Sequence, residues 1–192
     1  TSHSVPGLLQ AMADRGISPE QVDYVFVTHV HLDHAGGAGA LMQALPKAIA
    51  VVHPRGARHL AEPEKLIAGT RAVYGDEAFE RMYGDIIPIP AERIHVPEDG
   101  ETLELAGRPL RVMFTEGHAR HHYCLADPEG SGVFTGDSFG ISYRELDSDS
   151  GPFIFPTTTP VHFDPEAAHE SVDRIMALAP TYLFPTHFSR IE

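Results

Sequence analysis

The stretch Thr28–His34, with the sequence THVHLDH, limits what this chain can fold into more than any other segment. It follows the apolar run Tyr24–Val27 and precedes the glycine-rich run Ala35–Gly39. We therefore expect a loop at the carboxyl end of a buried strand, which is where open sheets place ligands. Three histidines and an aspartate within six residues would be costly in a core unless each polar group had a partner.

The spacing within this stretch favours metal binding. In an extended loop His29 and His31 project to the same side, and both imidazoles can reach one ion at about 2.0–2.1 Å. Asp33 and His34 are adjacent and face different directions, so they suit a second ion beside the first. The alternative interpretation is a set of solvated loop histidines, and the pattern further along the chain argues against it.

Composition narrows the class of protein. A length of 192 residues fits a single domain over residues 1–192, and 42% apolar with 21% charged residues is typical of a globular protein. The net charge of -13 argues against a nucleic-acid partner, because phosphate binding requires clustered Lys and Arg. No apolar run is long enough for a membrane span and no leader is evident, so we expect a cytoplasmic protein with a small-molecule substrate.

Cys124 is the single cysteine of the sequence, which excludes an internal disulfide. It lies in the apolar run Tyr123–Ala126. A buried core thiol is the favoured interpretation, and a metal ligand or a nucleophile are the alternatives.

Periodicity and turn residues predict an alternation of helices and strands in the first half and a β-rich second half. A helical insert over about residues 62–84 could serve as a lid, and residues 139–163 are expected to form an irregular pocket loop. The other expected elements are helices over Ser4–Asp14 and Ala38–Leu45 and from Pro165, with strands over Tyr24–Val27, Ala48–Val52, Thr102–Leu105, Leu110–Thr115, Tyr123–Ala126, Val133–Thr135 and Tyr182–Phe184.

Three later strand ends each carry a residue of ligand type. His118 follows the strand ending at Thr115, Asp137 follows the strand ending at Thr135, and His187 follows the last strand. The same arrangement repeated three times is difficult to reconcile with a histidine-rich surface. Together with the first motif it predicts a metal site assembled from strand ends.

The ordered series His29-x-His31-x-Asp33-His34, His118, Asp137 and His187 resembles the metallo-β-lactamase superfamily, in the branch that includes glyoxalase II and lactonases. The resemblance implies an α/β (α+β) fold, a four-layer αββα sandwich with a dinuclear site along one edge of its two sheets. Family members have several more strands before the first motif, whereas 28 residues precede His29 here, so we expect the chain to begin inside the first sheet.

The resemblance also implies the role of each ligand. His29, His31 and His118 would hold one ion, Asp33, His34 and His187 the other, and Asp137 would bridge them. The expected cofactors are two divalent ions, Zn²⁺ in first place with Mn²⁺ or Fe²⁺ as alternatives. A hydroxide shared by the ions would attack an ester, lactone or thioester, and Asp33 would orient it as the catalytic residue.

Pocket residues are predicted from the aromatic content of the irregular loop. Tyr143, Phe153 and His162 are the candidates for contact with substrate, and the scarcity of basic residues favours an apolar substrate. His121 and His122 are either pocket or supporting groups, or exposed loop residues.

Three rival functions stay open at this point. The same ligands could hold one iron in an oxygenase of the persulfide dioxygenase type, which the resemblance also includes. A phosphodiesterase of the same fold is the second rival, and a metal-binding module without catalytic activity is the third.

Overall fold

The computed structural model describes residues 1–158, 162–187 and 190–192. Contacts divide the chain into two compact units, Thr1–Pro97 and Glu98–Glu192. Each unit has its own sheet and its own apolar core. The mixed α/β class expected from the sequence is confirmed, while the assignment of residues 1–192 to a single domain stays a prediction.

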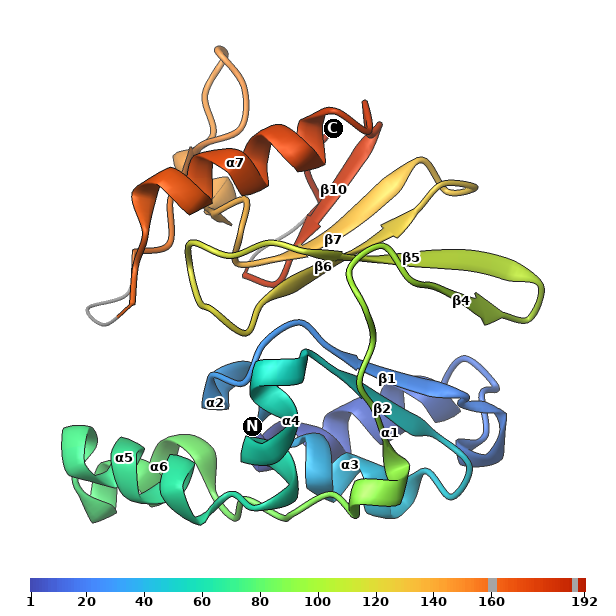
Figure 1. Ribbon diagram of the computed structural model, residues 1–192, viewed down its shortest axis with the longest axis vertical. Coiled ribbons are helices and arrows are strands. Elements are labelled where there is room, and N and C mark those ends of the chain that lie inside the picture. Colours follow the sequence, from blue (N-terminus) through green and yellow to red (C-terminus); the bar gives the residue numbers. More distant parts are fainter. Residues whose placement is uncertain (159–161, 188–189) are drawn as a thin grey trace. The chain divides into compact units, whose positions relative to one another are not determined.

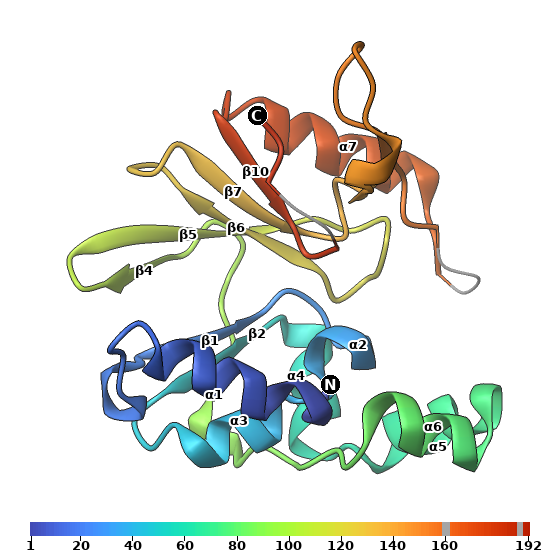
Figure 2. The ribbon, with the colours of Figure 1, turned by 180° about the vertical axis from the view of Figure 1, so that it is seen from behind.

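Unit 1, Thr1–Pro97, is built on a parallel three-stranded sheet with the order β1-β2-β3. Helices α1 and α3 lie on one face of this sheet (Figure 2), and their apolar side chains pack with those of β1 and β2. The strands are β1 Tyr24–Val27, β2 Ile49–Val52 and β3 Ile94–His95. The helices are α1 Val5–Ala13, α2 Leu32–Ala35, α3 Ala38–Ala44, α4 Pro54–Ala61, α5 Glu64–Tyr74 and α6 Asp76–Tyr83, with 3₁₀ turns Ser2–Ser4, Pro19–Gln21 and Ala91–Arg93.

Local chemistry sets the ends of these elements. Pro6 lies in the first turn of α1, and Gly16 follows the helix with a φ of 70° that favours glycine. The Arg93 guanidinium donates to the carbonyls of Met42 and Leu45 and to that of Ala48. It therefore satisfies carbonyl groups that the end of α3 leaves without helical partners.

The predicted helical insert over residues 62–84 consists of α5 and α6. Phe79 is its buried anchor, and the Arg71 guanidinium lies 4.3 Å from the centre of the Phe79 ring. A lid role for this segment stays a prediction.

Unit 2, Glu98–Glu192, contains a five-stranded sheet with the order β10-β7-β6-β5-β4. Helix α7, Pro165–Met176, covers one face of this sheet (Figure 1), and Ile175 packs there with Met113, Cys124 and Val133. The strands are β4 Thr102–Leu105, β5 Arg108–Phe114, β6 Tyr123–Asp127, β7 Gly132–Gly136 and β10 Tyr182–Pro185.

The segment expected to be an irregular pocket loop, 139–163, contains some regular structure. Ile141–Ser142 (β8) pairs antiparallel with Ile154–Phe155 (β9), and Arg144–Leu146 forms a 3₁₀ turn. Two-residue strands are too short to show the alternation from which strands are predicted, so β8 and β9 are not predictable from the sequence pattern. Residues 159–161 of the predicted loop lie outside the described residues.

Strand direction brings four segment ends of unit 2 to the same edge of its sheet. Strand β6 runs antiparallel to β5 and β7, while β10 runs parallel to β7. The carboxyl ends of β5, β7 and β10 therefore lie at the same edge as the amino end of β6. The connections that follow at this edge carry His118, Asp137 and His187.

No helix within the described part of the chain combines the length and the apolar content that crossing a bilayer requires.

We expect Ile175→Ala to lower the free energy of unfolding by about 2–5 kcal/mol, because it leaves a cavity at a core position that is 0% exposed. Met176→Ala is the matched control, since the neighbouring Met176 is 50% exposed and its truncation should change stability by less than about 0.5 kcal/mol. Urea unfolding of both variants measures the difference. Equal losses would contradict the assigned core face of α7.

Candidate metal centre

In unit 1, the histidines that follow β1 are gathered closely. His29 is 0% exposed, and its Nε2 lies 3.0 Å from Nδ1 of His31. The His29 and His34 rings have centroids 4.0 Å apart, and His34 Nε2 lies 3.2 Å from Oδ2 of Asp33. The Asp33 side chain is half exposed, so one carboxylate of this group is open to solvent.

The local backbone explains this gathering. His31 is extended, with φ -62° and ψ 143°, and it precedes α2 as its N-cap residue. Its carbonyl accepts the N–H of Ala35 at 2.8 Å. Asp33 and His34 therefore lie on the first turn of a short helix, and His29 and His31 lie on the extended segment before it.

The donor set of unit 1 fits a metal ion. Two nitrogen ligands of a tetrahedral zinc ion, each about 2.0–2.1 Å from the metal, lie about 3.3 Å from one another. The observed 3.0 Å between the His29 and His31 nitrogens is close to that separation.

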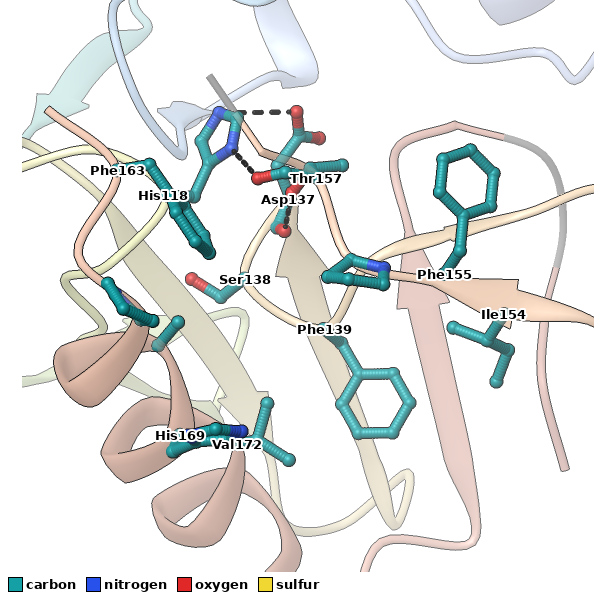
Figure 3. A pocket seen from close by; sticks show the side chains of 13 residues that line it. His118, Asp137, Ser138, Phe139, Ile154, Phe155, Thr157, Phe163, His169 and Val172 are labelled. Carbon is teal, nitrogen blue, oxygen red and sulfur yellow. Dashed lines mark hydrogen bonds and ion pairs between the residues drawn. The ribbon is translucent and has the colours of Figure 1, made fainter. Parts of the chain in front are cut away.

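In unit 2, the Asp137 carboxylate lies between two imidazoles. Its Oδ2 is 3.4 Å from His118 Nε2, and its Oδ1 is 3.8 Å from His187 Nε2. Asp137 is 6% exposed and His118 is 5% exposed. Each oxygen of the carboxylate thus faces a different histidine, and His118 and Asp137 point toward one another in Figure 3.

Thr157 contacts both His118 and Asp137. The Nδ1–H of His118 donates to the Thr157 carbonyl at 3.0 Å, and the Thr157 hydroxyl donates to the Asp137 carbonyl at 2.5 Å. A proton on Nδ1 leaves the lone pair of His118 on Nε2, the nitrogen that faces Asp137. Thr157 is one of three consecutive threonines, and nothing in the sequence singles it out.

The structure therefore gathers the predicted ligands in two groups, each within one unit. His29, His31, Asp33 and His34 form the group of unit 1, and His118, Asp137 and His187 form the group of unit 2. The metal-binding role of all seven stays a prediction.

A cavity of about 400 Å³ opens beside His118 and Asp137 within unit 2. Its walls come from the segment after β7, from β9 and from the first turns of α7 (Figure 3). Most of its lining side chains are apolar; they include Phe139, Phe155, Phe163, Ala168 and Val172, with His169 among the polar ones.

The three predicted pocket residues lie elsewhere among the described residues of this segment. The Tyr143 ring stacks on that of Phe155, with ring centroids 5.6 Å apart. Phe153 is 41% exposed. His162 has a φ of 74° and an exposed side chain. Among the described residues, none of these three lines the cavity, although Tyr143 stacks on Phe155, which does line it. Their contact with a substrate stays a prediction.

The residue before His118 packs tightly against α7. Gly117 has a φ of 119°, and a Cβ at this position would lie 2.4 Å from the backbone of Ala168. The Gly117 carbonyl also accepts the N–H of Asp164 at 2.9 Å, and Asp164 in turn caps α7 through the N–H groups of Glu166 and Ala167. The His118 loop and the start of α7 are therefore joined by backbone contacts.

Cys124 is a buried core thiol, as favoured from the sequence. It is 0% exposed, its Sγ lies 3.2 Å from Oγ1 of Thr115, and its S–H donates to the Thr135 carbonyl at 3.4 Å. Burial raises the pKa of the Cys124 thiol to about 12. A thiol with this pKa is protonated at neutral pH, which disfavours a nucleophilic role.

Comparison with known proteins identifies the family of this chain. Residues 1–187 match the model of the metallo-beta-lactamase superfamily. The chain belongs to the metallo-beta-lactamase superfamily, and the fold expected from the sequence is thereby confirmed at the level of the family.

One relative is the metallo-beta-lactamase fold-containing protein ST1585 from Sulfurisphaera tokodaii. It is 30% identical over an alignment of 184 positions, which covers 90% of this chain and 66% of the relative. Its crystal structure superposes with a TM-score of 0.74 over 88% of this chain and 63% of that chain. The chain thus spans slightly less than two thirds of this relative.

Two further comparisons bear on chemistry. A hydroxyacylglutathione hydrolase from a Synechococcus species is 31% identical over 114 residues, which are 59% of this chain and 33% of that protein. The protein TTHA1623, solved in a di-iron-bound form, is 27% identical with a TM-score of 0.62, over 96% of this chain and 77% of that chain.

We expect the stability of the chain to fall at alkaline pH because of Cys124. Above the ordinary thiol pKa of about 9, the unfolded chain releases the thiol proton, whereas the folded chain keeps it up to a pH of about 12. The free energy of unfolding should therefore fall by on the order of 1 kcal/mol per pH unit in this range. Cys124→Ala removes the contribution, so urea unfolding of this variant should show a shallower pH dependence; an unchanged slope would contradict the assignment.

Proposed function

We propose that this chain is a metal-dependent hydrolase that cleaves an apolar ester, lactone or thioester with two divalent ions, zinc in first place. The observation that carries the proposal is the Asp137 carboxylate, each oxygen of which faces the Nε2 atom of a different histidine. Together with these histidines, Asp137 would hold both ions, which would activate a water molecule and polarise a carbonyl group.

The metal-binding roles of the seven ligands are proposed as the family resemblance implies them. Membership of the superfamily supports this, because the match to its family model, residues 1–187, includes all seven residues. The ion held by three histidines would take His29, His31 and His118, and the other ion would take Asp33, His34 and His187.

Bound ions would supply a nucleophilic water near neutral pH and would polarise the scissile carbonyl. The chain's own side chains would orient the metal ligands and the attacking water. Thr157 fixes the tautomer of His118, so that the Nε2 lone pair is available as a ligand. Asp33, whose side chain is half exposed beside His34, is proposed to accept a hydrogen bond from the attacking water and orient it.

The cavity supports an apolar acyl group as the part of the substrate that is bound. Its wall includes His118 and Asp137 at the proposed metal site, while the aromatic rings of Phe139, Phe155 and Phe163 contribute apolar surface. Burial of a hydrocarbon chain gains about 0.8 kcal/mol per CH₂ group. The hydroxyacylglutathione hydrolase among the relatives is a hydrolase of an acyl compound, which agrees with this class of substrate.

Iron is the specific rival to zinc. TTHA1623 was solved with two iron ions and is 27% identical to this chain, so a di-iron centre is a second candidate for the same ligands. Metal content and oxygen uptake separate the two.

We expect the purified chain to bind two divalent ions and His187→Ala to bind about one, because this variant removes a ligand of one ion only. Metal analysis after dialysis against buffered Zn²⁺ gives the stoichiometry. His59→Ala is the matched control, since His59 lies on α4, outside both ligand groups. One iron per chain with oxygen uptake would instead favour the mononuclear oxygenase.

We expect turnover of at least one member of a panel of acyl lactones, aryl esters and acyl thioesters by the zinc-loaded chain. Asp137→Asn should lower kcat/KM by at least about 100-fold, because an amide cannot bind an ion through each of its two polar atoms. A bis-aryl phosphodiester completes the panel. Turnover of the phosphodiester alone would contradict the proposed acyl substrate and favour the phosphodiesterase.

A further inference from the structure

A fully buried imidazole contacts the main chain of Asp137. His122 is 0% exposed, and its Nε2 accepts the backbone N–H of Asp137 at 3.1 Å. Its Nδ1 lies 2.8 Å from Oγ1 of Thr115 and 3.0 Å from Oγ of Ser138. The sequence left open whether this histidine was exposed, and the structure places it in the interior of unit 2.

These contacts determine the tautomer of His122. A backbone amide can only donate, so Nε2 must carry a lone pair and the proton of the neutral ring must be on Nδ1. The Ser138 hydroxyl donates to the Thr115 carbonyl at 3.0 Å, which leaves its oxygen able to accept. Nδ1–H therefore donates to the two hydroxyl oxygens of Thr115 and Ser138.

Cys124 extends this series of hydrogen bonds. Because the Thr115 oxygen accepts from the imidazole, its O–H is available to the Cys124 Sγ at 3.2 Å. The Cys124 S–H then donates to the carbonyl of Thr135, two residues before Asp137. A chain of donors thus connects the end of β5, the start of β6 and the end of β7, and it both begins and ends beside the proposed bridging aspartate.

Both main-chain groups of Asp137 are consequently held by side chains distant in sequence. His122 accepts its N–H from 15 residues away, and Thr157 donates to its carbonyl from 20 residues away. Asp137 follows directly after Gly136, whose φ of 52° marks a sharp change of direction after β7. The direction of the carboxylate therefore depends on groups that do not themselves contact its oxygens.

We propose that His122 is a positioning residue that, in its Nδ1-protonated form, holds Asp137 in the orientation in which its two carboxylate oxygens face His118 and His187. The inference rests on the proposed function in one respect, the binding of metal ions by Asp137. His122 itself is not proposed to contact ions or substrate.

Two conservative substitutions test the contacts of the two imidazole nitrogens separately. His122→Gln can place its amide oxygen where Nε2 lies and so can still accept the Asp137 N–H. His122→Asn can place its amide where Nδ1 lies and so keeps the contact with Thr115 and Ser138 but loses the one with Asp137. His121→Asn is the matched control, at the neighbouring and less buried histidine.

Zn²⁺ affinity, measured by competition with a chelating dye, and the visible spectrum of the Co²⁺-loaded chain are the readouts. We expect His122→Asn to raise the Kd of the weaker-bound ion by about 10- to 100-fold and to alter the Co²⁺ spectrum. His122→Gln should largely restore both, and His121→Asn should match the wild type. Thermal unfolding without metal checks that the variants are folded; equal effects of Gln and Asn at position 122 would overturn the proposal.

A measurement on the wild-type chain tests the same proposal without any variant. Long-range ¹H–¹⁵N correlation of the imidazoles, recorded without metal, should show His122 neutral and protonated on Nδ1. A proton on Nε2 would overturn the inference whatever the variants do. Failure of the wild-type chain to bind Zn²⁺ at all would instead contradict the proposed function, so the two failures are distinguishable.

Discussion

A carboxylate that is 6% exposed has lost most of its hydration, and this loss costs several kcal/mol unless cations or hydrogen-bond donors replace the water. Asp137 is in this position in unit 2. Two imidazoles face its oxygens, but at 3.4 and 3.8 Å they are farther away than ordinary hydrogen-bond donors and replace only part of what water provides. A pair of divalent ions would replace the rest. The unfavourable burial of this one group is therefore a physical reason to expect the proposed metal ions at this edge of the sheet.

The sheet supplies the framework for that burial. Apolar side chains of β5, β6, β7 and α7 form the core of unit 2 and fix the strand register, and the register decides which residues emerge at the edge. His118, Asp137 and His187 come from three different connections at this edge. Since no two of them are neighbours in the sequence, their mutual distances depend on strand pairing and on the polar contacts of Thr157 and His122.

Much of this arrangement is predictable from the sequence. Strand Tyr24–Val27 has the expected bounds, and α7 begins at Pro165 as expected, because apolar periodicity and proline mark these positions clearly. The ligand candidates are recognisable because histidine and aspartate at strand ends carry a chemical signal. Thr157 and Ser138 carry none, because hydroxyl residues are common in loops and their side-chain partners here are 16 or more residues away. The choice of Tyr143 and Phe153 for the pocket relied on aromatic content, which cannot tell which rings of a loop turn toward a cavity and which stack on its outer side.

The contact between Gly117 and Ala168 limits how the substrate range of this chain could diverge. Any side chain at position 117 would push on the backbone of α7, and so would disturb the proposed ligand His118 and the cavity wall together. Val172 lines the same cavity one helical turn further along and is free of this contact. Divergence of the proposed acyl specificity would thus have more freedom at position 172 than at position 168, with the proposed metal ligands left undisturbed.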